Sequence, residues 1–195
     1  STIQKLGGLI DMSRTDDLLK KYGEFISIPW QDGVAAPQRI VFAVYPPKDE
    51  LRLRAHIDEF KIETKKAGHT WEHIDLTDSF PEWLSTQRYA ESYYNNPDLL
   101  QPLMPKFIEF LDDKVKQVIS NLEIDDNTVV AISGIGTLFE LVKVKDVVEK
   151  IVDQIPGRLL VLFPGTYEND NYRLLDVTMV GIIWPRRSQL ISRST

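Results

Sequence analysis

A short apolar run that ends in two glycines most constrains the fold of this chain. Within Thr128-Val-Val-Ala-Ile-Ser-Gly-Ile-Gly-Thr137, the residues Val129 to Ile132 are all apolar. An apolar run without polar alternation favours a strand that is buried on both faces, as in the middle of a parallel sheet. Gly134 and Gly136 let the backbone turn sharply where the strand ends, and an amphipathic stretch follows. The segment therefore predicts a strand, a glycine turn and a helix, the unit of open α/β sheets.

Other segments repeat this pattern along the chain. Further strands are predicted at Arg39–Tyr45, Trp71–Leu76, Arg158–Phe163 and, as an edge strand that could run antiparallel, Val177–Trp184. Helices are predicted at 48–67, with an apolar stripe that includes Leu51 and Ile62, at 103–122 and at 138–155. In the first helical segment, 3–22, Gly7-Gly8 weaken the opening turns and Ser13 offers the start of a second helix. We expect a three-layer α/β fold: an open, mainly parallel sheet of about five strands with helices on both faces.

The chain length fits a single α/β domain over residues 1–195, with three segments outside the regular alternation. These segments are an N-terminal helical part and loop (1–37), an aromatic-rich helical insertion (79–102) and a basic tail (185–195). Trp30 in the first loop either closes an edge of the core or faces a partner. The insertion carries Tyr89, Tyr93 and Tyr94, which either form a binding surface or fill a small satellite core.

Composition excludes several classes of function. The chain has no cysteine, which rules out disulfides, thiolate zinc sites and cysteine nucleophiles. With 23 basic and 29 acidic residues, a net charge of −6, it lacks the basic footprint of a nucleic-acid-binding protein, except in the tail arginines Arg186, Arg187 and Arg193. No stretch approaches the roughly 18 to 20 apolar residues of a membrane span. We therefore expect a cytoplasmic protein without membrane contact, and nucleic acid as a partner only through the tail.

The motifs of common enzymes are incomplete. Gly134-Ile-Gly136-Thr-Leu-Phe139 resembles the start of a dinucleotide-binding turn, but Phe139 stands at the position of its third glycine, and no phosphate-binding P-loop is present. Ser133 forms only half of a hydrolase nucleophile elbow. His73, like the other two histidines, is not in a metal-binding spacing. The sequence thus predicts no catalytic residue, no metal and no cofactor.

Three strand ends nevertheless carry unusual residues. They are Tyr45-Pro46-Pro47, Ser133–Thr137 and Pro164-Gly165-Thr166-Tyr167. If the strands are parallel, these segments meet at the carboxyl edge of the sheet, where open α/β folds bind ligands. The alternative explanation is that these residues only form the turns that strands need where they end.

The order of these motifs resembles that in the BrxB-like family, small components of BREX bacteriophage-defence systems. The similarity rests on Tyr45-Pro-Pro-Lys-Asp-Glu-Leu-Arg52, the Gly134–Phe139 turn, and Phe163-Pro-Gly-Thr-Tyr167 with Arg173-Leu174, and it spans about residues 39–176. The chain departs from the family at Glu140–Lys145, at Thr166 and at its C-terminal end. The resemblance implies an accessory protein of phage defence beside a PglZ-type partner of the alkaline-phosphatase superfamily, and brings no catalytic residue with it.

We therefore expect a non-catalytic adaptor that binds a PglZ-like or other defence-system protein. The alternative is a small enzyme or sensor that binds a nucleotide or phosphate at the glycine turn, 133–137. The residues predicted to bind a partner or ligand come from the strand ends and the insertion. They are Tyr45, Ser133, Gly134, Gly136, Thr137, Gly165, Tyr167, Arg173, Tyr93 and Tyr94.

Overall fold

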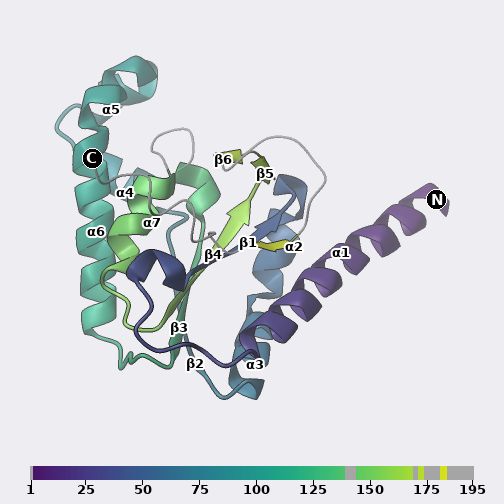
Figure 1. The fold of residues 1–195 in the computed structure, drawn as a ribbon. Coiled ribbons are helices and arrows are strands. Elements are labelled where there is room, and N and C mark those ends of the chain that lie inside the picture. Colours follow the sequence, from purple (N-terminus) through teal and green to yellow (C-terminus); the bar gives the residue numbers. More distant parts are fainter. Residues whose placement is uncertain (1, 139–143, 169–170, 174–180, 184–195) are drawn as a thin grey trace.

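The centre of the molecule is a sheet of four parallel strands, extended at one edge by a short antiparallel strand (Figure 1). The computed structural model describes residues 2–138, 144–168, 171–173 and 181–183. The strands are β1 (Ile40–Tyr45), β2 (Thr70–Asp75), β3 (Thr128–Ser133), β4 (Arg158–Pro164) and β7 (Gly181–Ile183), in the spatial order β2-β3-β4-β1-β7. The predicted α/β fold with a mainly parallel sheet of about five strands is confirmed: four strands are parallel, and β7 is the antiparallel edge strand.

The strands formed where continuous apolar runs predicted them. All residues of β1, β3 and β4 are buried, as expected of strands covered on both faces. The edge strand β7 pairs antiparallel with β1, and the rest of the predicted strand 177–184 lies outside the described residues. A small hairpin of β5 (Thr166–Glu168) and β6 (Asn171–Arg173) follows β4 and was not predicted.

Helices cover both faces of the sheet, which gives the three layers expected (Figure 1). One face packs against α1 (Thr2–Ile26), α2 (Glu50–Ala55) and α3 (Ile57–Lys66), through side chains such as Tyr22, Leu53 and Phe60. The other face packs against α4 (Ser79–Ser85), α6 (Met104–Ser120) and α7 (Val144–Val152). Short 3₁₀ turns occur at η1 (Ala36–Arg39), η2 (Pro47–Asp49) and η4 (Ile135–Leu138). None of the helices in the described part of the chain is long and apolar enough to cross a membrane.

Three helix predictions need correction. The first helix continues through Gly7-Gly8 and Ser13 as a single α1, because a glycine in a helix costs only about 1 kcal/mol. The helix predicted at 48–67 is divided at His56, whose amide bonds to the Leu53 carbonyl three residues back. Leu51 and Ile62 each lie two residues from a buried side chain of the same helix, Leu53 and Phe60, and so on the other side of it; they are 82% and 50% exposed. Of the helix predicted at 138–155, α7 covers 144–152, while 139–143 lie outside the described residues.

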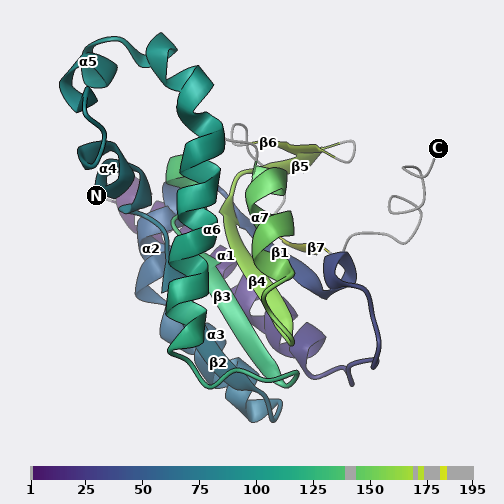
Figure 2. The same cartoon turned by 90° about the vertical axis from the view of Figure 1, so that its left-hand side faces the viewer.

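The aromatic insertion is part core and part surface. It contains α4, α5 (Ala90–Asn95) and η3 (Pro97–Leu103), and α5 projects beyond the end of α6 in both views (Figures 1 and 2). The Trp83 ring is buried 5.1 Å from that of Phe107 on α6, and Tyr93 packs partly against the same core. Tyr89 and Leu99 remain 56% and 47% exposed. The satellite-core interpretation therefore holds for the base of the insertion, and exposed apolar side chains remain on its outer part.

Candidate functional site

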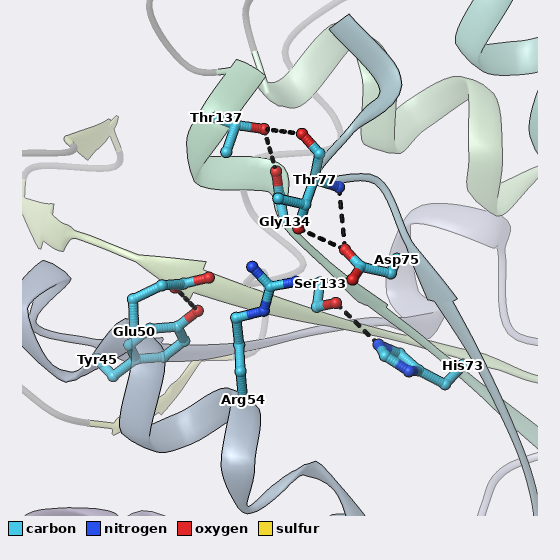
Figure 3. A network of polar contacts seen from close by, with 9 residues as sticks. All are labelled: Tyr45, Glu50, Arg54, His73, Asp75, Thr77, Ser133, Gly134 and Thr137. Carbon is cyan, nitrogen blue, oxygen red and sulfur yellow. Dashed lines mark hydrogen bonds and ion pairs between the residues drawn. The ribbon is translucent and has the colours of Figure 1, made fainter. Parts of the chain in front are cut away.

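The carboxyl ends of β1, β2 and β3 gather polar side chains at one edge of the sheet (Figure 3). Tyr45, the last residue of β1, is 2% exposed, and its hydroxyl donates to Glu50 Oε2 at 2.5 Å. Burial, and then the charge of Glu50, raise the pKa of the Tyr45 hydroxyl above its ordinary value. Tyr45 is therefore held in its neutral form as a donor to the first turn of α2.

A serine and a histidine form a pair across β2 and β3. Ser133 is 1% exposed, and its Oγ lies 2.8 Å from His73 Nε2. His73 stands on the edge strand β2, and partial burial lowers the pKa of its imidazole from the ordinary 6.5, against the opposing charge of Asp75. The pair resembles the nucleophile and base of a hydrolase in composition.

Asp75 is the centre of the polar network at this edge (Figure 3). Its Oδ1 accepts from the Thr77 amide at 2.9 Å and the Thr77 hydroxyl at 2.5 Å, and its Oδ2 accepts from Arg54 Nη2 at 2.7 Å. Burial acts to raise the pKa of Asp75, but the Thr77 bonds and the charges of Arg54 and His73 lower it overall. Asp75 is thus an ionised carboxylate whose two oxygens are both engaged.

The glycine turn after β3 is packed closely against its neighbours. Gly134 has φ +77, and a Cβ added to it would lie 2.3 Å from the Thr77 amide nitrogen. A Cβ on Gly136 would lie 2.5 Å from Pro164 Cγ. The Thr137 hydroxyl donates to the Gly134 carbonyl at 2.7 Å. These glycines are required because two other segments of the chain approach them, Thr77 after β2 and Pro164 at the end of β4.

The arrangement does not complete a catalytic triad. A triad needs a third group that orients the imidazole through its other nitrogen, and Asp75 instead binds Thr77 and Arg54. Ser133, the candidate nucleophile of the pair, is buried, with 1% of its surface exposed. Over the described ranges, no group of His, Asp and Glu side chains is arranged to hold a metal ion.

The structure brings together most of the predicted strand-end residues. Tyr45, Ser133, Gly134, Gly136 and Thr137 meet at the carboxyl edge, as the parallel topology requires. They are joined there by Gly165, whose amide donates to the Tyr45 carbonyl at 2.9 Å.

The other predicted residues lie elsewhere. Tyr167 and Arg173 stand in the β5–β6 hairpin, and Tyr93 and Tyr94 in α5. The side chains of Tyr94, Tyr167 and Arg173 fall outside what the structure describes, and Tyr93 is half-buried against the core.

Sequence reasoning missed five members of the network: Glu50, Arg54, His73, Asp75 and Thr77. A signal existed for two of them, because His73 and Asp75 alternate on a strand and so face the same side of the sheet as Ser133 on its neighbour. No sequence signal identified Arg54, whose contact with Asp75 depends on how α2 packs beside β2.

Comparison with known proteins identified no relative: no family model, no curated protein and no solved structure matches this chain.

Proposed function

We propose that this protein is a non-catalytic accessory component of a BREX-like bacteriophage-defence complex, in which it binds a larger PglZ-type protein. One observation carries the proposal. The three motifs on which the family resemblance rests contact one another at the carboxyl edge, where their described hydrogen bonds and packing hold the fold together.

These contacts join each motif to another. The Gly165 amide of the third motif donates to the carbonyl of Tyr45 in the first, and Pro164 fills the space beside Gly136 of the second. Tyr45 in turn bonds to Glu50 within its own motif. Residues whose polar atoms satisfy one another stabilise an architecture. This use of the motifs favours a structural and binding role over catalysis.

The outer part of the insertion offers the surface for a partner. Tyr89 and Leu99 are exposed there, and the Arg88 guanidinium lies over the Tyr89 ring, 5.5 Å from its centroid. Tyrosine and arginine are among the side chains that contribute most energy to protein interfaces. We call Arg88, Tyr89 and Leu99 the insertion surface, and propose that it contacts the PglZ-type protein.

The alternative, a nucleotide or phosphate site at the glycine turn, receives no support from the packing. Thr77 and Pro164 occupy the space next to Gly134 and Gly136. It remains a prediction, as does nucleic-acid binding through the basic tail 185–195, which lies outside the described residues.

Affinity capture with a PglZ-type protein of a BREX system tests the proposal. The wild-type chain is expected to be retained, and Tyr89→Asp with Leu99→Asp to weaken binding by about tenfold or more. Ile62→Asp on α3 is the matched control, since Ile62 is 50% exposed and lies outside the insertion. Equal retention of the insertion variant and the control would place the interface elsewhere, and no retention of the wild-type chain would refute the adaptor role.

A further inference from the structure

The amino edge of the sheet carries a second cluster of functional side chains, which the family motifs do not include. Arg39 precedes β1, His69 precedes β2, Asn127 precedes β3 and Arg158 opens β4. Because the strands are parallel, these positions meet at one edge. Together with Trp30 they line a groove of about 530 Å³.

Trp30 is held in this groove by stacking. Its ring lies 3.8 Å from that of His69 with an interplanar angle of 8°, and the Arg158 guanidinium carbon lies 4.8 Å from the ring centroid. His69 is fixed in turn, because its Nδ1 is 2.6 Å from Asn127 Oδ1 while the Asn127 amide donates to the Gly68 carbonyl. The loop that carries Trp30 is therefore held in place, and its aromatic ring forms one wall of the groove.

Two guanidinium groups line the same groove in partly desolvated positions. Arg158 is 8% exposed, and Arg39 Nη1 donates to the Pro156 carbonyl at 2.6 Å. Burial, and then the charge of Arg39, lower the pKa of Arg158. The Arg39 Nε–H is buried without a partner within the described ranges. An anion bound beside the two groups would offset their mutual repulsion and give the Arg39 Nε–H an acceptor.

We infer that this groove binds a phosphate group, either the free ion or the phosphate of a small monoester. Guanidinium groups bind phosphate oxygens through paired, charge-assisted hydrogen bonds. The groove volume of about 530 Å³ exceeds what a phosphate ion needs, and the Trp30–His69 wall can pack against an organic substituent. Asp32 and Asp126 also line the groove but are exposed, so the anion is expected at the Arg39–Arg158 end.

A nuclear magnetic resonance titration of the full chain with inorganic phosphate tests this inference. Ionic strength is held constant with sodium chloride, because phosphate also stabilises folded proteins without binding them. The Trp30 indole N–H signal is expected to shift and saturate. Arg39→Gln is expected to weaken phosphate binding by about tenfold, since it removes one of the two guanidinium groups. Arg88→Gln, which changes an arginine on the insertion surface, should bind as the wild type does.

The result overturns the inference if the Trp30 signal shifts without saturation, or saturates with the same affinity in Arg39→Gln. A shift confined to the amides of Gly134 and Gly136 would also overturn it, because phosphate would then bind at the opposite edge of the sheet. If circular dichroism shows that Arg39→Gln does not fold, the titration is repeated with Arg39→Lys. An affinity for phosphate equal to that of the wild type would then contradict the proposed site. A parallel titration with adenosine monophosphate identifies the source: tighter binding than phosphate indicates a monoester, and equal binding indicates the free ion.

Discussion

Substitution of Gly134 by alanine probes the most crowded point of the candidate site. Gly134 has φ +77, a backbone conformation that costs an L-residue with a side chain about 1–2 kcal/mol. The new Cβ would also lie 2.3 Å from the nitrogen and 2.7 Å from the Cα of Thr77. These are backbone atoms, so no side-chain rotation relieves the clash, and overpacking of this kind adds about 1–3 kcal/mol. We expect Gly134→Ala to lower the free energy of unfolding by about 2–5 kcal/mol.

Gly68→Ala separates the two contributions. Gly68 has φ +88, and a Cβ added to it meets nothing within 4 Å, so only the conformational cost applies. This control is expected to lose about 1–2 kcal/mol. Gly134→Ala combined with Thr77→Ala should recover little, because it removes the Thr77 hydroxyl, 2.4 Å from the new Cβ, but leaves the clash with the Thr77 backbone.

Urea unfolding followed by circular dichroism measures these differences. The reasoning predicts that Gly134→Ala is less stable than Gly68→Ala by about 1–3 kcal/mol. If the two variants agree within about 0.5 kcal/mol, the close approach of Thr77 to the glycine turn is not as described.

Further predictions concern a titrating group, a buried hydrogen bond and the core. Because the pKa of His73 is lowered from 6.5 in the folded protein, the unfolded chain takes up its proton first, and the free energy of unfolding should fall as pH drops below 6.5. His73→Gln should show a smaller fall between about pH 7 and pH 5 in urea titrations, and an identical fall would contradict this assignment. Tyr22→Phe removes the buried 2.6 Å bond to Thr64 and should cost about 1 kcal/mol in the same assay, so an unchanged midpoint would argue against that bond. Phe107→Ala removes a fully buried ring and should lower the free energy of unfolding by about 3–5 kcal/mol. A decrease of less than about 1 kcal/mol would show that the aromatic cluster is not packed as described.

The sequence predicted β1, β3 and β4 well because these strands are buried on both faces. Runs such as Val129–Ile132 have no polar alternation, and only a central strand of a covered sheet suits that pattern. The pair β5–β6 was missed, since its described residues, Thr166–Glu168 and Asn171–Arg173, carry no apolar run.

The helices were harder to predict, because periodicity does not locate their breaks. The continuous pattern from 48 to 67 concealed the division at His56, and Leu51 was assigned to the core although it is 82% exposed. Conversely, the glycine pair at 7–8 suggested an interruption that α1 does not have. Both errors concern single residues whose effect depends on tertiary packing.

The candidate site was located by topology and not by chemistry. Parallel strands place Tyr45 and Ser133 at one edge whatever their partners are, so their proximity could be predicted. Their hydrogen-bond partners, Glu50 and His73, could not be predicted in the same way, because these contacts depend on where a helix begins and on the register of the strands. The same topological argument, applied to residues that precede strands, would have located the Arg39–Arg158 groove at the opposite edge.

Light scattering of this chain mixed with a PglZ-type protein of a BREX system tests the proposed function most directly. The account predicts a single species whose mass is that of a stoichiometric complex of the two proteins, and which the Tyr89→Asp and Leu99→Asp changes dissociate. Two separate species at every concentration tested would contradict the claim that this protein acts by binding that partner.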